Sequence, residues 1–75
     1  MKYHAYYFDS DNDLYNIIKT EDYNQTMQTI KHYMTGSDTG IMTIILDEYD
    51  QDEHGKYLYG STMWKRQENG QYKVI

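Results

Sequence analysis

The sequence predicts a small α+β fold in which one amphipathic helix packs on an antiparallel sheet of four or five strands, in the order β-β-α-β-β-β. Three observations support this prediction: an apolar, β-branched run at residues 41–46, helical periodicity at residues 21–34, and aromatic segments bounded by turn-forming residues. A chain of 75 residues is expected to form a single domain, residues 1–75.

The first part of the chain is expected to form two strands joined by a turn. Residues 2–8 are rich in aromatic side chains, which favour strands. Asp9–Asp13 is a turn by composition, because Asp, Ser and Asn side chains bond to nearby backbone. Residues 14–19 could form either a helix or a strand. A strand is preferred, because in one continuous helix their apolar side chains would lie opposite those that follow Thr20.

The segment Glu21–Met34 is the clearest helix. Its apolar side chains recur at i, i+4, i+7 and i+11, which forms one stripe: Tyr23, Met27, Ile30 and Met34. Thr20 is the expected N-cap, and Gly36 is the expected end.

The strand beginning at Ile41 is expected to organise the sheet. Strict alternation places Met42, Ile44 and Leu46 on one face and Ile41, Thr43, Ile45 and Tyr49 on the other. Both sets are largely apolar, but one helix covers only one face. An exposed apolar patch, which would mark an interaction site, is therefore expected from some of these residues: Ile41, Ile45, Tyr49, Tyr57, Tyr59, Trp64 and Tyr72.

The last third of the chain is expected to form two more strands. Residues 50–55 are a polar connection and residues 56–67 a returning strand, in which Gly60 marks a bulge or a close backbone approach. Asn69-Gly70 suits a type I′ turn, which would place Trp64 opposite Ile75.

Motifs for catalysis, cofactors and metals are missing. Asp9-x-Asp11-x-Asp13 resembles the start of an EF-hand calcium loop, but Leu14 replaces the glycine at the sixth position and Thr20 the glutamate at the twelfth. The three histidines lack ligand spacing, and no nucleophile or phosphate-binding pattern occurs. We expect no enzyme activity, no cofactor and no metal site.

Charge is the remaining functional signal. The net charge is −5: residues 1–55 carry eleven acids against three lysines, and residues 56–75 carry four basic residues against one acid. This balance disfavours direct nucleic-acid binding and suits a basic protein partner. Ten of the twelve acids form two clusters: Asp9, Asp11, Asp13, Glu21 and Asp22, and then Asp47, Glu48, Asp50, Asp52 and Glu53.

These clusters either keep loops solvated or imitate a phosphate backbone. Carboxylates on alternate strand residues lie ~7 Å apart, whereas duplex DNA carries one charge per ~1.7 Å. Imitation therefore requires both clusters on one side of the fold. The candidate partner-binding residues, with Tyr49 and Tyr57 as anchors, are Asp47, Glu48, Tyr49, Asp50, Asp52, Glu53, Tyr57, Asp9, Asp11 and Asp13.

In size, acidity and lack of catalytic motifs, the chain resembles the small acidic inhibitors of phages and other mobile elements, including anti-CRISPR and anti-restriction proteins. The resemblance implies a protein that occupies the basic nucleic-acid-binding surface of a host enzyme. The alternative is a self-associating adaptor with a homodimer interface on the open sheet face. Without cysteine or a membrane-spanning run, a cytoplasmic protein is expected.

Overall fold

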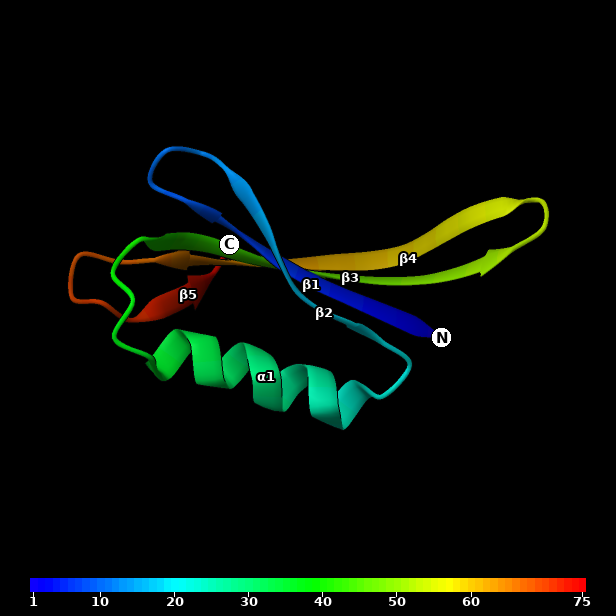
Figure 1. Cartoon of the computed structure of the whole chain (residues 1–75), viewed down its shortest axis with the longest axis horizontal. Helices are drawn as coiled ribbons and strands as arrows, with labels where there is room; N and C mark the ends of the chain where they lie inside the picture. Colours follow the sequence, from blue (N-terminus) through cyan, green and yellow to red (C-terminus); the bar gives the residue numbers. More distant parts are fainter.

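The computed structural model describes residues 1–75 and confirms the predicted fold class, one helix on a five-stranded antiparallel sheet (Figure 1). The strand order is β2-β1-β3-β4-β5, so the strand that begins at Ile41 is also central in space. Residues 14–19 are strand, as preferred. The elements are β1 (Lys2–Asp9), β2 (Leu14–Thr20), α1 (Tyr23–Thr35), β3 (Ile41–Asp52), β4 (Gly55–Arg66) and β5 (Tyr72–Val74).

The N-cap of helix α1 lies two residues later than predicted. Asp22 is the N-cap, and its Oδ1 accepts the backbone N–H of Gln25 at 3.0 Å. The Thr20 hydroxyl oxygen instead accepts the N–H of Asp22 at 3.2 Å, and Thr20 ends β2. The carboxylate of Asp22 at the N-cap also interacts favourably with the positive end of the helix dipole. The helix ends at Thr35, and Gly36 is its C-cap, in agreement with the predicted stop. The helix is neither long nor apolar enough to cross a membrane.

The predicted helical stripe faces the sheet only in part. Ile30 is buried, Met27 and Met34 are half-buried, and Tyr23 is 48% exposed. Thr26, which the apolar pattern omitted, is fully buried, and its hydroxyl donates to the carbonyl of Asp22. The helix packs on β1 and β2. The core lies between the helix and the sheet and consists of Ala5, Ile30, Ile41, Ile44 and Leu46.

A bulge at the start of β3 corrects the predicted alternation. Phe8 pairs with Thr43 and Asp9 with Ile41, which leaves Met42 as the extra residue. Beyond the bulge the facing of side chains reverses. Ile41 therefore joins Ile44 in the core rather than lying on the opposite face.

The large open apolar patch expected on the far side of the sheet is mostly absent. Ile41, Ile45 and Tyr49 are only 2 to 6% exposed, whereas Tyr57 and Tyr59 are 52% and 61% exposed. Trp64 and Tyr72, the other two residues of the expected set, are half-buried against the core.

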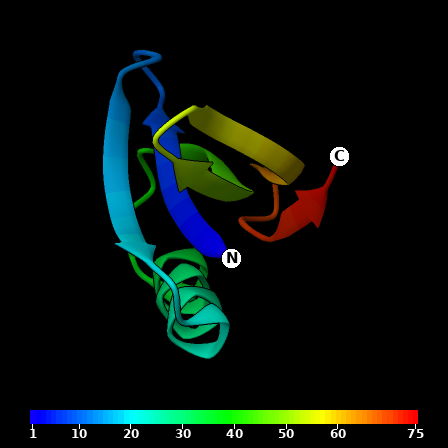
Figure 2. The ribbon, with the colours of Figure 1, turned by 90° about the vertical axis from the view of Figure 1, so that its right-hand side faces the viewer.

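Long side chains on neighbouring strands shield the far face without a second layer of structure. Ile45 pairs with Tyr6 and Met63, and Tyr49 with Lys2 and Leu58. The ammonium group of Lys56 lies 4.4 Å from the centroid of the Tyr49 ring. The sheet is also strongly twisted (Figure 2), which brings side chains of adjacent strands over one another.

Two hairpins differ from the sequence prediction. Gly70 has φ 86° and donates its N–H to Gln67, and Asn69 does not adopt a positive φ. The loop therefore has three residues rather than the two of a type I′ turn, and the pairing shifts by one residue. Trp64 consequently faces Val74 instead of Ile75.

The hairpin of β3 and β4 is longer than predicted. The expected polar connection at residues 50–55 is strand as far as Asp52, whose Oδ1 accepts the N–H groups of His54 and Gly55 at 2.8 and 3.1 Å. The bulge predicted near Gly60 is present, because the register skips Tyr59. A Cβ added at Gly60 would meet nothing within 4 Å, so close approach does not explain this glycine.

Candidate functional site

Strands β3 and β4 project beyond the rest of the sheet as a two-stranded arm, residues 50–59 (Figure 1). Strand β1 pairs with β3 only as far as Tyr49, and β5 pairs with β4 only at residues 64–66. All residues from Gln51 to Tyr59 are exposed. The arm therefore offers both of its faces and its outer strand edges to other molecules.

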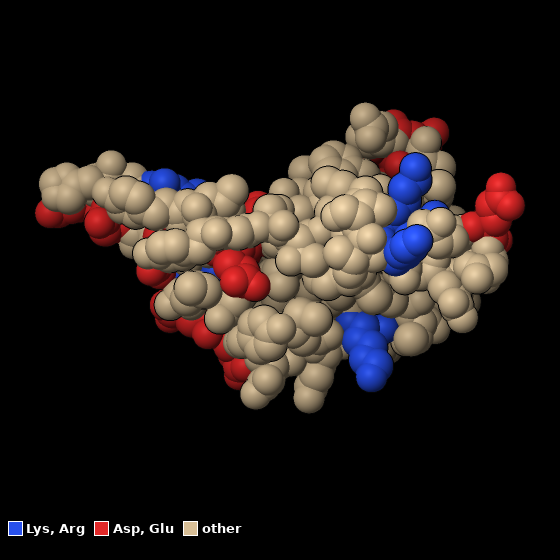
Figure 3. All heavy atoms as spheres, turned by 180° about the vertical axis from the view of Figure 1, so that it is seen from behind, with Lys and Arg blue, Asp and Glu red and all other residues tan.

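Two acids of the arm and one just before it form a row on one face. Alternation along β3 places Glu48, Asp50 and Asp52 on the side of the sheet that carries Leu46 and the helix, at spacings of ~7 Å. Figure 3 shows Asp and Glu atoms along the lower border of the arm, the helix side, and Lys or Arg atoms at its upper border.

Two exposed tyrosines accompany this row. Tyr57 pairs with Asp50, and the hydroxyl of Tyr59 donates to Asp50 Oδ2 at 3.0 Å. Both rings therefore lie on the same side as the carboxylates. We call this surface, which includes Glu48 just before the arm, the acidic face of the arm: Glu48, Asp50, Asp52, Tyr57 and Tyr59.

Six of the ten sequence-predicted residues lie off the acidic face, and three of these are in β3 or the turn that follows it. Asp47 is on the opposite face, where it accepts hydrogen bonds from the hydroxyls of Tyr6 at 3.1 Å and Ser61 at 2.8 Å. Tyr49 is only 2% exposed, so its ring cannot serve as the exposed anchor that the sequence suggested. Glu53 lies in the turn at the tip of the arm, 3.4 Å from the His54 ring nitrogen.

Asp9, Asp11 and Asp13 are far from the arm. Asp9 pairs with Ile41 and Ser10 donates to the carbonyl of Gly40, so this turn lies beside the start of β3. The arm is at the other end of the same strand (Figure 1). Asp9, Asp11 and Asp13 therefore do not share a surface with the acids of the arm. Glu21, from the same predicted cluster, lines a hollow together with Tyr49 and Gln51 of β3, so the two clusters meet only in part within a single chain.

The carboxylates of Asp9, Asp11 and Asp13 do approach within 4.8 Å of one another. Asp9 Oδ1 accepts the backbone N–H groups of Asp11 and Asp13 at 3.0 and 2.9 Å, and Asn12 adopts a left-handed φ of 65°. The Asp9 side chain thus stabilises the turn. Leu14, at the position of the turn glycine of an EF-hand loop, and Thr20, at the position of its last ligand, are both in β2.

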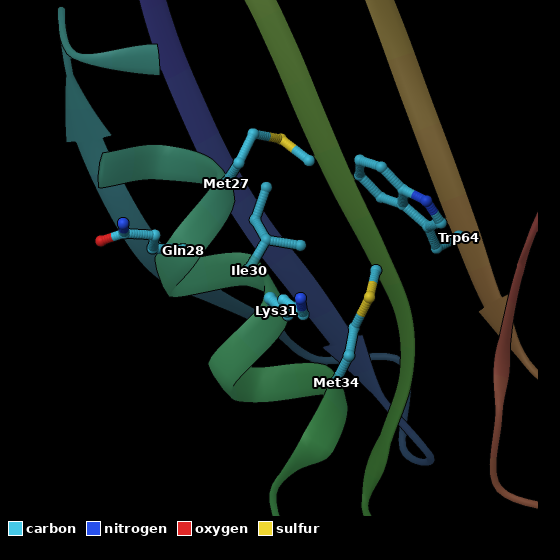
Figure 4. Close-up of a pocket in the computed structure, with 6 residues that line it drawn as sticks. All are labelled: Met27, Gln28, Ile30, Lys31, Met34 and Trp64. Atoms are coloured by element: carbon cyan, nitrogen blue, oxygen red, sulfur yellow. The ribbon is translucent and has the colours of Figure 1, made fainter. Parts of the chain in front are cut away.

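An apolar hollow that the sequence did not reveal lies on the helix side of the sheet. It has a volume of about 280 Å³ and is lined mainly by Met27, Ile30 and Met34 of α1 and Trp64 of β4 (Figure 4). Met27 and Met34 extend over β3 toward Trp64. Because α1 packs on β1 and β2, this strip of the sheet stays open.

Hydrogen bonding and burial raise the pKa of the tyrosines beside Asp50 and Asp47. The bond to Asp50 and the negative charge of Asp50 raise the pKa of Tyr59. Burial, and then the charge of Asp47, raise the pKa of Tyr6. Both hydroxyls therefore remain protonated at neutral pH and act as hydrogen-bond donors.

No protein-family model, curated protein or solved structure matches this chain.

Proposed function

We propose that this protein binds a basic protein surface through the acidic face of its arm, and that this surface normally holds nucleic acid. The observation that carries the proposal is the row of Glu48, Asp50 and Asp52 beside the exposed rings of Tyr57 and Tyr59. Carboxylates are good partners for arginine and lysine, and exposed tyrosines are frequent anchors at interfaces. Charge would speed the encounter, while buried aromatic contacts would supply most of the affinity.

The spacing of the row limits what it can imitate. One strand of duplex DNA carries a phosphate every ~3.4 Å of axis, so carboxylates ~7 Å apart match every second phosphate. Three carboxylates cover only a short stretch of backbone. The proposed target is therefore a small basic site that holds a few phosphates, rather than a long channel.

The apolar hollow supports a second contact on the same side of the molecule. Met27 and Met34 have flexible, polarisable side chains that adapt to an inserted apolar group. An apolar side chain of the same partner would pack there while basic residues meet the arm. Occupation of the target would exclude nucleic acid, which makes the protein an inhibitor of the anti-CRISPR or anti-restriction type, acting in the cytoplasm.

The test is binding to a panel of purified CRISPR effectors and restriction enzymes, with duplex DNA as competitor and at about 0.05 and about 0.5 M salt. We expect at least one enzyme to bind in competition with DNA, and affinity to fall as salt rises. The double variant Glu48→Lys/Asp50→Lys should weaken binding by at least about tenfold.

The matched control is Asp11→Lys/Asp13→Lys, which makes the same charge change at the other end of the molecule. The side chains of Asp11 and Asp13 make no hydrogen bond in the structure. The control should bind as the parent does. Equal loss of affinity in both double variants would show that only net charge matters, and would reject the arm as the binding surface. Binding that duplex DNA does not compete with would also reject the proposal.

A further inference from the structure

We propose that the outer edge of β4 in the arm pairs with the same edge of a second copy of this chain, as an antiparallel, two-fold symmetric dimer. This inference rests on the proposed function and extends it, because the dimer would place two rows of carboxylates on one surface. The interface would be the strand edge rather than the open sheet face that the sequence suggested.

The first observation is a long unpaired edge. Strand β3 pairs with β4 along one side from Gly55 to Lys65, but on the other side β5 reaches only residues 64–66 and the N–H of Ile75 bonds to Met63. Residues 55–62 therefore have no strand neighbour on their outer side. Unpaired backbone N–H and C=O groups along such an edge are a template for another strand.

The second observation is the composition of this edge. Features that usually block edge pairing are sparse, since residues 55–62 contain no proline and only one charge, Lys56. Tyr57, Leu58 and Tyr59 are each more than half exposed and have high strand propensity or apolar character. The bulge at Tyr59 is the one irregularity.

A second copy suits this edge because the sequence is compatible with itself in antiparallel register. Pairing centred on Leu58 places Tyr57 opposite Tyr59 of the other copy, twice, and Lys56 opposite Gly60. Aromatic cross-strand pairs stabilise antiparallel sheets, and no lysine opposes another lysine. Both copies use the same patch, as a two-fold interface requires.

The dimer would also gather more carboxylates on one surface than a single chain does. A two-fold axis perpendicular to the sheet leaves the helix sides of both copies on one surface, so the rows of Glu48, Asp50 and Asp52 lie side by side. Three strand spacings separate them, about 14 Å. Two parallel rows of carboxylates then resemble a nucleic-acid backbone more closely than one row does.

Repulsion between the rows gives the dimer a distinctive dependence on salt. A separation of about 14 Å exceeds the Debye length of ~8 Å at physiological ionic strength, so the repulsion is weak there and grows at low salt. Dimerisation should strengthen as salt rises. Binding of a basic partner should weaken as salt rises, which separates the two proposals experimentally.

The experiment is sedimentation equilibrium of the full chain over a roughly hundredfold range of concentration, at about 0.05 and about 0.5 M salt. We expect a monomer–dimer equilibrium that favours the dimer at the higher salt. Hydrogen exchange should show amides of residues 55–62 slowing as the dimer forms. Leu58→Lys would place two lysines opposite each other and should abolish the dimer.

The control is Leu14→Lys, the same substitution at similar exposure (51% against 58%) on β2, the opposite edge of the sheet. It should dimerise as the parent does. A monomer at both salt concentrations, or dissociation by Leu14→Lys instead of Leu58→Lys, would overturn the inference.

Different results would reject the dimer and the proposed function. A Leu58→Lys monomer that keeps full, salt-sensitive affinity for an enzyme would show that one arm suffices, and would overturn the claim that paired arms form the binding surface. A dimer that binds no enzyme of the panel would support the edge contact and reject the proposed function.

Discussion

The helix-backed part of the molecule and the arm use the same residue types differently. Tyr3 and Tyr7 of β1 and Tyr33 of α1 pack against the core, whereas Tyr57 and Tyr59 in the arm are exposed. The difference follows from position relative to the helix, because a two-stranded ribbon with no covering layer cannot bury a ring on both faces. Tyrosine content alone therefore does not distinguish core from surface in this chain.

The largest expected contrast is in side-chain truncation. Ile44 is fully buried beneath α1, and Ile44→Ala should lower the free energy of unfolding by about 3 kcal/mol, because it leaves a cavity. Leu58→Ala in the arm removes an exposed side chain and should cost no more than about 0.5 kcal/mol. Urea unfolding followed by circular dichroism measures both. A loss at Leu58 comparable to that at Ile44 would show that the arm contributes to the core.

Local patterns in the sequence predicted the elements well but not their irregularities. The apolar stripe of α1 identified the helix, because helical periodicity is a local property. The bulge at Met42 was undetectable, since Ile41 and Met42 are both apolar and either could face the core. The polarity of Asp50–Asp52 suggests a loop, but these residues are strand. Two strands of a solvent-exposed ribbon pair through their backbones and need no apolar side chains to do so.

The candidate site was only partly predictable for a related reason. The acids of the arm stand out in the sequence, and alternation within β3 alone separates Asp47 from Glu48 and Asp50. The predicted strand to Tyr49 suffices to separate Asp47 from Glu48, but placing Asp50 and Asp52 beside Glu48 requires knowing that the strand continues to Asp52. The hollow was missed because Met27 and Met34 fit the helical stripe as core residues. Their partial exposure depends on which strands α1 covers, and that is a tertiary property.

A second, smaller contrast separates acids that stabilise the backbone from acids that do not. Asp22 caps α1, so Asp22→Ala should cost about 1 kcal/mol by leaving the N–H of Gln25 without its side-chain partner. The neighbouring Glu21 makes no hydrogen bond in the structure and is exposed. Glu21→Ala is therefore the matched control and should change stability by no more than about 0.5 kcal/mol. Equal losses would mean that net charge, rather than the cap, is responsible.

The smallest contrast compares two tyrosine–aspartate hydrogen bonds, Tyr6 to Asp47 in the body of the sheet and Tyr59 to Asp50 in the arm. Both tyrosines have a folded-state pKa above the ordinary value of 10.0, Tyr6 chiefly through burial and Tyr59 chiefly through its hydrogen bond. A raised pKa favours the protonated folded state. The resulting stability is present below the unfolded pKa and is lost as pH rises through the folded pKa.

Alkaline unfolding therefore separates the two regions of the molecule. Ionisation of Tyr6 must be accommodated within the folded sheet, whereas Tyr59 can ionise after local opening of the arm, without global unfolding. Tyr6→Phe should reduce the loss in urea midpoint between about pH 8 and about pH 11 more than Tyr59→Phe does. If Tyr59→Phe has the larger effect, the arm unfolds together with the body, and the arm is then a cooperative part of the fold rather than a separate projecting element.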